Sequence, residues 1–247
     1  MPKFVLLSGP SCVGKTPLRR ALDRLYPDLA ATLTNVVPYN SRERRSGERE
    51  GVEYHFRSRA ELEARAERDG SLLVWVRDDL QAVDPAQLQA IFAAGSTAFW
   101  EGNPAVIDAL EQAGALAHVE TLRVFVSPLS RDEILSLKSP ESGADVRTFV
   151  TDLMRRKLFW RKKRQKGSLS PTDAEDIETR AATAYDELRV AWKFDAVLPN
   201  HDGEDSENWA AFPCLLGDAR RTVEAFAALL RGEQCDWAER WERELVP

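Results

Sequence analysis

Hydrophobic positions along the chain change their period repeatedly. Phe4 to Leu7 is a continuous apolar run, which is typical of a strand buried on both faces of a parallel sheet. A glycine-bearing loop follows, and then Leu18, Leu22 and Leu25 recur at helical spacing until Pro27 ends the pattern. The chain is therefore expected to open with a strand, a loop and a helix.

The same alternation continues downstream. Further helices are indicated at about 58–69, 85–94, 104–112 and 217–230, and strands at about 33–37, 72–76, 97–100, 122–126 and 194–198. Three pairs have the spacing of helix capping boxes: Ser58 with Glu61, Ser130 with Glu133, and Thr172 with Glu175. Such alternation favours an α/β fold with a parallel sheet covered by helices on both faces.

Composition narrows the class of protein. Hydrophobic residues make up 43% and charged residues 30%, as in soluble globular proteins. No apolar run approaches the roughly 20 residues that span a bilayer, and no basic segment with a long apolar stretch opens the chain, so we expect a cytoplasmic protein without membrane attachment. The three cysteines show no CxxC spacing, which indicates neither a disulfide framework nor zinc. A net charge of -6 argues against general nucleic-acid attraction, so any anion site must be local.

Residues 9–16 read GPSCVGKT, a full match to the GxxxxGK[ST] phosphate-binding loop (P-loop), placed between a predicted strand and a predicted helix. Its glycines permit a tight turn, so that backbone N–H groups and the helix N-terminus surround phosphate oxygens. The pattern predicts that ATP binds here, with Lys15 as a charge at the transferring phosphate and the Thr16 hydroxyl as a ligand for Mg²⁺. The predicted ATP-binding residues of the loop are Gly9, Pro10, Ser11, Cys12, Val13, Gly14, Lys15 and Thr16.

Cys12 is unusual at the middle of such a loop. A helix N-terminus can lower the pKa of a thiol and make it oxidisable. The alternative is a small side chain that the loop tolerates, and we favour this interpretation because only the position of Cys12 supports the other.

Residues 40–56, NSRERRSGEREGVEYHF, show no helical or strand period. Two guanidinium groups and a phenol in such a segment suit a bound phosphate dianion, although a solvated charged loop has a similar composition. The segment resembles the acceptor-phosphate signature of guanylate kinases, TTRxPRxGExxGxxYxF, at Arg42, Arg45, Gly47, Glu48, Gly51, Tyr54 and Phe56. The resemblance implies that Arg42, Arg45 and Tyr54 hold the acceptor's phosphate, while Glu48 orders the arginines or contacts the substrate.

The resemblance extends from the P-loop to about Leu230. It implies a P-loop NTPase three-layer fold with a central parallel sheet, an inserted acceptor-binding subdomain and a helical lid. We expect a single domain over 1–247, divided into a core (1–37, 86–137 and 193–230), the acceptor-binding subdomain (38–85), the lid (138–192) and a C-terminal helical tail (231–247).

Several positions depart from the family's pattern. Pro38 replaces a serine, Val74 replaces the glutamate that reads guanine, and residues 81–83 (Gln-Ala-Val) replace tyrosine, glycine and serine or threonine. Phosphate-binding residues are thus kept while base-reading residues are lost, which puts guanine specificity in question. Gln81 and Asp84 remain as polar groups that can read an acceptor.

The segment 155–166, RRKLFWRKKRQK, has eight basic residues among twelve. A mobile lid can bring such charge over a transferring phosphoryl group while excluding water. By resemblance to the family's lid, Arg161, Arg164 and Arg180 are candidate catalytic residues. A solvated helical face or a nucleic-acid patch would have the same composition.

Two further residues are assigned by position in the resemblance. Glu101 takes the place of the family's strand-terminal aspartate, where a carboxylate can orient the acceptor or a magnesium-bound water. Asn200 follows the last predicted strand, where the family has an asparagine and an aspartate near the donor adenine.

The sequence therefore predicts a guanylate-kinase-like enzyme that transfers the γ-phosphoryl group of ATP to a nucleoside monophosphate, GMP or dGMP or a related one. No strong base is needed, because a phosphate oxygen already attacks as an anion and positioning carries the rate. Two alternatives stay open: a kinase of another phosphorylated small molecule, such as a modified nucleotide or a sugar phosphate, and a non-catalytic binding module. The expected partners are ATP and a phosphorylated acceptor, and the protein is expected to be a monomer or a homodimer.

Overall fold

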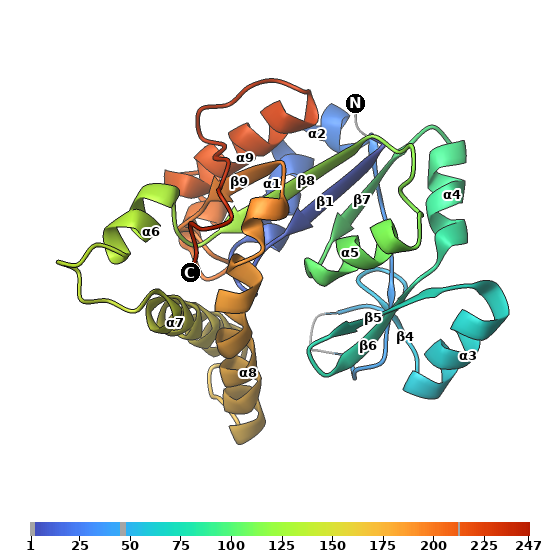
Figure 1. Cartoon of the computed structure of the whole chain (residues 1–247), viewed down its shortest axis with the longest axis horizontal. Helices are drawn as coiled ribbons and strands as arrows, with labels where there is room; N and C mark the ends of the chain where they lie inside the picture. The colour runs from blue at the N-terminus through green and yellow to red at the C-terminus, as the bar shows by residue number, and fades with distance from the viewer. Residues whose placement is uncertain (1–2, 45–47, 212) are drawn as a thin grey trace. The chain divides into compact units, whose positions relative to one another are not determined.

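The computed structural model describes residues 3–44, 48–211 and 213–247. Its elements alternate as the sequence predicts (Figure 1). The helices are α1 (Lys15–Leu25), α2 (Pro27–Ala30), α3 (Arg59–Asp69), α4 (Pro85–Ala93), α5 (Ala105–Gln112), α6 (Arg131–Leu137), α7 (Val146–Lys166), α8 (Pro171–Leu188) and α9 (Gly217–Leu230), with 3₁₀ turns η1 (Ala191–Lys193) and η2 (Glu207–Ala210). The strands are β1 (Phe4–Ser8), β2 (Leu33–Asn35), β3 (Tyr39–Asn40), β4 (His55–Phe56), β5 (Leu72–Val76), β6 (Asp79–Val83), β7 (Thr97–Glu101), β8 (Thr121–Ser127) and β9 (Ala196–Pro199).

The predicted central parallel sheet is confirmed. Its strand order is β2-β7-β1-β8-β9, and β2 pairs with β7, and β8 with β9, in parallel. All five residues of β1 are buried, which explains why its sequence is apolar without alternation. By its contacts the chain divides into two units, one formed by Met1–Leu6 with Thr32–Leu122 and the other by Leu7–Ala31 with Arg123–Pro247.

The first unit contains a second sheet that the sequence analysis did not predict. Its order is β4-β3-β6-β5, with β5 and β6 forming an antiparallel hairpin and β3 pairing in parallel with β4. Only β5 was predicted, because β3 and β4 have two residues each and cannot display a period. Leu62 of α3 packs with Leu80 and Ala82 of β6, so the helix covers one face of this small sheet.

The second unit carries the helices that surround the P-loop and the predicted lid. In Figure 1, α1 and α9 lie side by side, and α7 and α8 pack against each other. Val150, Met154 and Leu158 of α7 are fully buried, as are Ala181 and Leu188 of α8. Apolar residues at helical spacing therefore hold the pair together, while the basic residues of α7 lie largely on its other faces.

The predicted helical tail is wrong. Helix α9 ends at Leu230, and the structure has no helix over residues 231–247, all of which it describes. Instead Glu239 exchanges two backbone hydrogen bonds of 2.8 Å with Val197 of β9. Trp241 and Leu245 are buried, as a helical period would also require, but backbone pairing with the sheet edge overrides the local pattern.

One of the three predicted capping boxes also needs correction. Ser58 with Glu61 and Ser130 with Glu133 form complete boxes at the starts of α3 and α6. Helix α8 begins earlier than expected: Ser170 caps it with Asp173, not Thr172 with Glu175. Pro171 explains this start, because proline is favoured in the first helical position and has no N–H to satisfy.

Within the described ranges, no helix combines the length and apolar character that crossing a bilayer requires.

We predict that Leu158→Ala destabilises the protein by about 2–5 kcal/mol, because it opens a cavity where α7 packs on α8. Urea unfolding followed by circular dichroism measures the change. The neighbouring Phe159→Ala is the matched control, since Phe159 is 39% exposed and its loss should cost far less. Equal losses from the two variants would contradict the packing described for this helix pair.

Candidate functional site

The P-loop has the strand–loop–helix geometry that its sequence predicts. It leaves β1 at Ser8, and α1 begins at Lys15 with Gly14 as its N-cap residue. Gly9 and Gly14 have φ angles of 138° and 106°, and a Cβ would lie 2.2 Å from Val126 O at the first and 2.5 Å from the Asn200 amide nitrogen at the second. Both positions therefore require glycine. The Lys15 ammonium donates to the carbonyl oxygens of Gly9 (2.7 Å) and Pro10 (2.9 Å), which holds its charge over the loop.

Cys12 has the environment of a structural thiol. Its side chain is buried and its φ angle is 71°, in the left-handed region. Burial, and then the nearby Glu204 carboxylate, raise the pKa of the Cys12 thiol to about 12. A protonated, buried thiol is unreactive, which agrees with the interpretation that the loop simply tolerates a small side chain.

The Asn200 side chain supports the P-loop through a hydrogen bond to the loop backbone. Its side chain is fully buried, and its amide nitrogen donates to Val13 O (2.7 Å) and Asp202 O (2.8 Å), while its amide oxygen accepts from Asp202 N (3.2 Å). These bonds engage both hydrogens of the amide, so in this structure the side chain supports the loop, and the contact with the donor adenine stays a prediction. Asn200 therefore fixes the carbonyl group of Val13 within the loop.

The segment after Asn200 contributes residues that the sequence analysis did not single out. The Asp202 carboxylate accepts from Ser206 Oγ (2.8 Å), from Asn208 Nδ2 (2.9 Å) and from Ala219 N (3.0 Å) in the first turn of α9. Although burial opposes ionisation, these bonds lower the pKa of Asp202. Trp209 Nε1 donates to Asp202 O at 2.6 Å, and its ring lies beside Gly14. The available signal for this segment in the sequence was the pair Asn200 and Asp202, which directly follows a predicted strand.

The predicted acceptor residues Arg42, Glu48 and Tyr54 lie together in the first unit. Arg42 donates two hydrogen bonds to the Glu48 carboxylate, at 2.7 and 2.5 Å, and its guanidinium carbon lies 5.1 Å from the centre of the Tyr54 ring. Burial opposes the charge of Arg42, but Glu48 outweighs it and raises the pKa of the guanidinium. Glu48 thus fixes the Arg42 guanidinium, as expected of a residue that orders an arginine. Arg45 and Gly47 lie outside the described residues.

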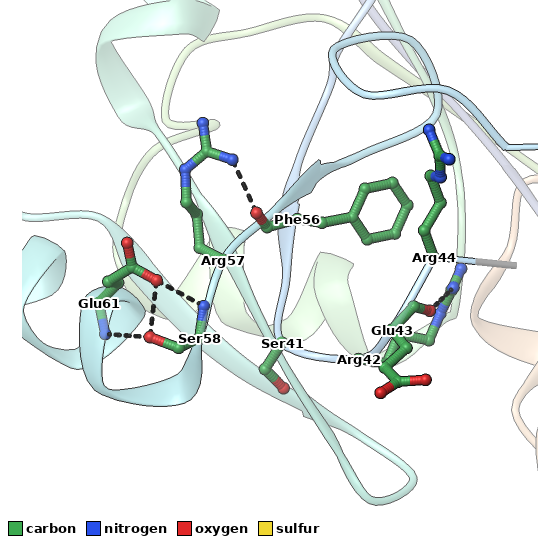
Figure 2. A pocket seen from close by; sticks show the side chains of 8 residues that line it. All are labelled: Ser41, Arg42, Glu43, Arg44, Phe56, Arg57, Ser58 and Glu61. Carbon is green, nitrogen blue, oxygen red and sulfur yellow. Dashed lines mark hydrogen bonds between the residues drawn. The ribbon is translucent and has the colours of Figure 1, made fainter.

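A pocket of about 530 Å³ adjoins Arg42 (Figure 2). Figure 2 shows the Phe56 ring between the segment carrying Arg42 and Arg44 and the segment carrying Arg57. Arg57 donates to Glu50 at 2.8 Å and to Phe56 O at 2.7 Å. Arg44 and Arg57 were not predicted, because neither stands at an arginine of the family's signature. The pocket's lining also includes Ser41, Glu43, Ser58 and Glu61.

The positions predicted to read the acceptor have diverse surroundings. Gln81 is buried on β6, in register with Asn40 of β3 and with Val74 of β5. Asp84 is committed to structure, because it caps α4 and forms an ion pair of 2.8 Å with Arg65. Glu101 is half-buried at the end of β7, as predicted from its place in the sequence.

The three candidate lid arginines differ in their surroundings. Arg161 of α7 is largely buried and forms an ion pair with Glu204. Arg180 of α8 is 5% exposed and lies 3.0 Å from the Asp176 carboxylate, one turn away. Arg164 is half-exposed and lies 3.4 Å from the exposed Glu207. The structure therefore sets Arg161 and Arg180 apart from Arg164.

His201 is more constrained than a loop histidine. Its Nδ1 lies 2.5 Å from Asp218 at the start of α9, and its Nε2 lies 2.9 Å from Glu133 at the start of α6. Burial lowers its pKa, but the two carboxylates outweigh this effect and raise it above the ordinary value. His201 thus connects the loop after β9 to the starts of two helices.

In the described part of the chain, no group of three or more His, Cys, Asp or Glu side chains gathers as a metal site would.

Comparisons with known proteins agree with this geometry. The sequence model of the family described as guanylate kinase matches residues 1–153. A guanylate kinase of Rhodococcus jostii (strain RHA1) is 31% identical over 208 residues, which cover 81% of this chain and 81% of that protein. The chain belongs to the guanylate kinase family. It is accordingly an ATP-dependent phosphotransferase of the nucleoside monophosphate kinase class.

Other relatives of the guanylate kinase family extend the comparison. A guanylate kinase of Nocardia farcinica (strain IFM 10152) is 34% identical over 140 residues, 54% of this chain and 67% of that protein. The crystal structure of guanylate kinase from Anaplasma phagocytophilum matches with a TM-score of 0.52 at 15% identity, over 99% of this chain and 93% of that one, and so shares the fold. The family model ends within α7, so it says nothing about Arg161, Arg180 or Asn200.

We predict that Asn200→Ala weakens ATP and GTP binding alike, by about tenfold, and lowers Tm. The variant leaves Val13 O and Asp202 O without their donor, which loosens the loop that both triphosphates share. Calorimetric titration with each nucleotide and thermal unfolding measure the effects. A loss confined to ATP, with Tm unchanged, would instead indicate a contact with the adenine.

Proposed function

We propose that this protein transfers the γ-phosphoryl group of ATP to a nucleoside monophosphate, with GMP as the simplest acceptor. The observation that carries the proposal is the presence, in one chain of this family, of two groups of residues that suit anions and differ in construction. One is the P-loop, formed by backbone amides and Lys15, and the other is the pocket beside the Arg42–Glu48 pair.

In this proposal the P-loop residues Gly9 to Thr16 hold the phosphates of ATP. Asn200 holds the carbonyl oxygen of Val13, and the N–H of the same peptide belongs to Gly14, so this N–H keeps a direction suited to phosphate oxygens. Lys15, now held by two loop carbonyls, exchanges those contacts for phosphate oxygens when the nucleotide binds. Its charge then offsets the negative charge that spreads over the transferring group.

The family's usual metal also suits the loop. The hydroxyl of Thr16, in the first turn of α1, is a hard oxygen donor of the kind that Mg²⁺ accepts beside water and phosphate oxygens. Thr16 would therefore hold Mg²⁺, which supplies charge neutralisation at the phosphates when bound.

The acceptor's phosphate is proposed to bind Arg42, Arg45 and Tyr54. Arg42 is pre-ordered, because Glu48 fixes its guanidinium plane and the rings of Tyr54 and Phe56 lie within 5.1 and 5.6 Å of it. Gln81 and Glu101 are proposed to contact the rest of the acceptor. The phosphate oxygen attacks as an anion, so this side of the reaction needs positioning rather than a base.

We predict that the purified chain forms ADP from ATP with one or more members of a panel of GMP, dGMP, AMP, CMP, UMP and sugar phosphates. Lys15→Ala should lower kcat at least about a hundredfold while leaving the fold intact, because the transferring phosphate loses its cation. Coupled detection of ADP measures the rate, and Lys163→Ala, on the outer face of the lid, is the control expected to stay active. Consumption of a sugar phosphate alone would favour a kinase of another metabolite, and ATP binding without turnover would favour a binding module.

We also predict that Arg42→Lys raises KM for the acceptor by about tenfold or more and changes KM for ATP less than about threefold. A lysine cannot make the two parallel hydrogen bonds of a guanidinium, either to Glu48 or to a phosphate. Initial rates at varied acceptor and fixed ATP, and the reverse, separate the two constants. Arg59→Lys, an exposed arginine of the same unit, is the control. An unchanged acceptor KM would remove Arg42 from the proposed site.

A further inference from the structure

An acidic segment, residues 202–207, lies directly against the P-loop. Glu204 N donates to Cys12 O at 3.2 Å, within the loop. A Cβ on Gly203 would lie only 2.4 Å from the same oxygen, so glycine is what permits this approach. The segment is therefore held by the backbone of the loop itself.

The same segment binds basic side chains of α7. The Glu204 carboxylate forms an ion pair with Arg161, and the two side chains are 17% and 16% exposed. Lys157, one helical turn earlier, donates to His201 O at 2.6 Å and lies 3.9 Å from the Asp205 carboxylate. One end of the lid helix is thus tied to the P-loop through residues 201–205.

The electrostatics of Arg161 follow from this arrangement. Burial disfavours its charge, but Glu204, with smaller contributions from Cys12 and from Asp176 of α8, raises the pKa of the guanidinium. Arg161 in turn lowers the pKa of the Cys12 thiol, although burial and Glu204 outweigh this effect. A permanently charged arginine is thereby kept beside residues that bind phosphate.

One hydrogen-bond donor of the Arg161 guanidinium, its Nε–H group, has no acceptor in the part of the chain that the structure describes. The Nε atom is buried. A buried donor without an acceptor is costly and calls for an explanation. A nucleotide bound at the P-loop would bring phosphate oxygens that can accept a hydrogen bond from this Nε–H group.

We propose that Glu204 is a positioning residue for the donor site: it holds Arg161 against the P-loop so that the free Nε–H of Arg161 meets the phosphates of a nucleoside triphosphate. Glu204 acts through Arg161 and does not itself bind phosphate. The inference rests on the proposed binding of ATP at the P-loop and adds a residue that lies outside the part matched by the family model.

The test is Glu204→Gln in the full chain, which removes the charge and keeps the size of the side chain. Its affinity for ATP, titrated by calorimetry without acceptor, should fall about ten- to hundredfold, as expected when a charge-assisted contact is lost. Glu178→Gln is the matched control, because Glu178 forms an exposed ion pair with Arg155 of the same helix. Its ATP affinity should stay within about twofold of that of the unchanged chain.

A double-mutant cycle separates positioning from general stabilisation. Arg161→Lys alone should also weaken ATP binding, and Glu204→Gln added to it should cause less than about a twofold further loss, because Glu204 acts only through Arg161. Glu204→Asp, which keeps the carboxylate, should retain part of the affinity and provides the comparison if Glu204→Gln does not fold. Unchanged affinity in Glu204→Gln, additive losses in the cycle, or Glu204→Asp as weak as Arg161→Lys would each overturn the proposal.

These titrations are independent of turnover. A chain that binds ATP but phosphorylates no acceptor would refute the proposed function while leaving the Glu204 effect measurable. Normal turnover with full ATP affinity in Glu204→Gln would refute the positioning role alone. A chain that bound no ATP would overturn both.

Discussion

The donor site depends on one constraint: the carbonyl groups of the P-loop must be held by hydrogen bonds from other parts of the chain. Backbone amides can surround a phosphate only if the same peptides have their carbonyl groups satisfied on the other side. Asn200 does this for Val13, and Glu204 N does it for Cys12, while the glycines at 9 and 14 allow neighbouring atoms to approach within distances that any side chain would block. The orientation of the loop is thus set by residues almost two hundred positions away in the sequence.

The segment after β9 joins this loop to the rest of its unit. Asp202 accepts from the start of α9, and its carbonyl oxygen accepts from Asn200 and Trp209, so a single residue connects the helix, the loop and the 3₁₀ turn η2. His201 adds a link between the starts of α6 and α9. Polar groups that satisfy one another's hydrogen bonds favour a single arrangement, which suits a site that must hold its donors in place before the substrate arrives.

The sequence predicted those features whose signals are local. The strand, P-loop and first helix, the box that starts α3 at Ser58, and helix α9 were each visible in a short window. The two-residue strands β3 and β4 were not, because they are too short to show a period, and β6 was not, because its sequence Asp-Leu-Gln-Ala-Val does not alternate strictly and its other neighbour, β3, is distant in the sequence. Asn200 was assigned to ATP from its position, but its burial under Val13 could only be seen in three dimensions. The tail failed for a related reason, since pairing of Glu239 with Val197 competes with a helical pattern.

Both proposed anion sites use the same device, which explains how a chain of net charge -6 can be suited to highly charged ligands. In each, an arginine is paired with a carboxylate: Arg42 with Glu48, and Arg161 with Glu204. The carboxylate cancels much of the long-range field, so attraction by net charge cannot account for binding. What the pairing supplies is direction, because a guanidinium fixed on one edge keeps its remaining N–H groups oriented and loses less conformational entropy when a phosphate binds. Binding at such sites should therefore depend on geometry at the guanidinium more than on the total number of positive charges nearby.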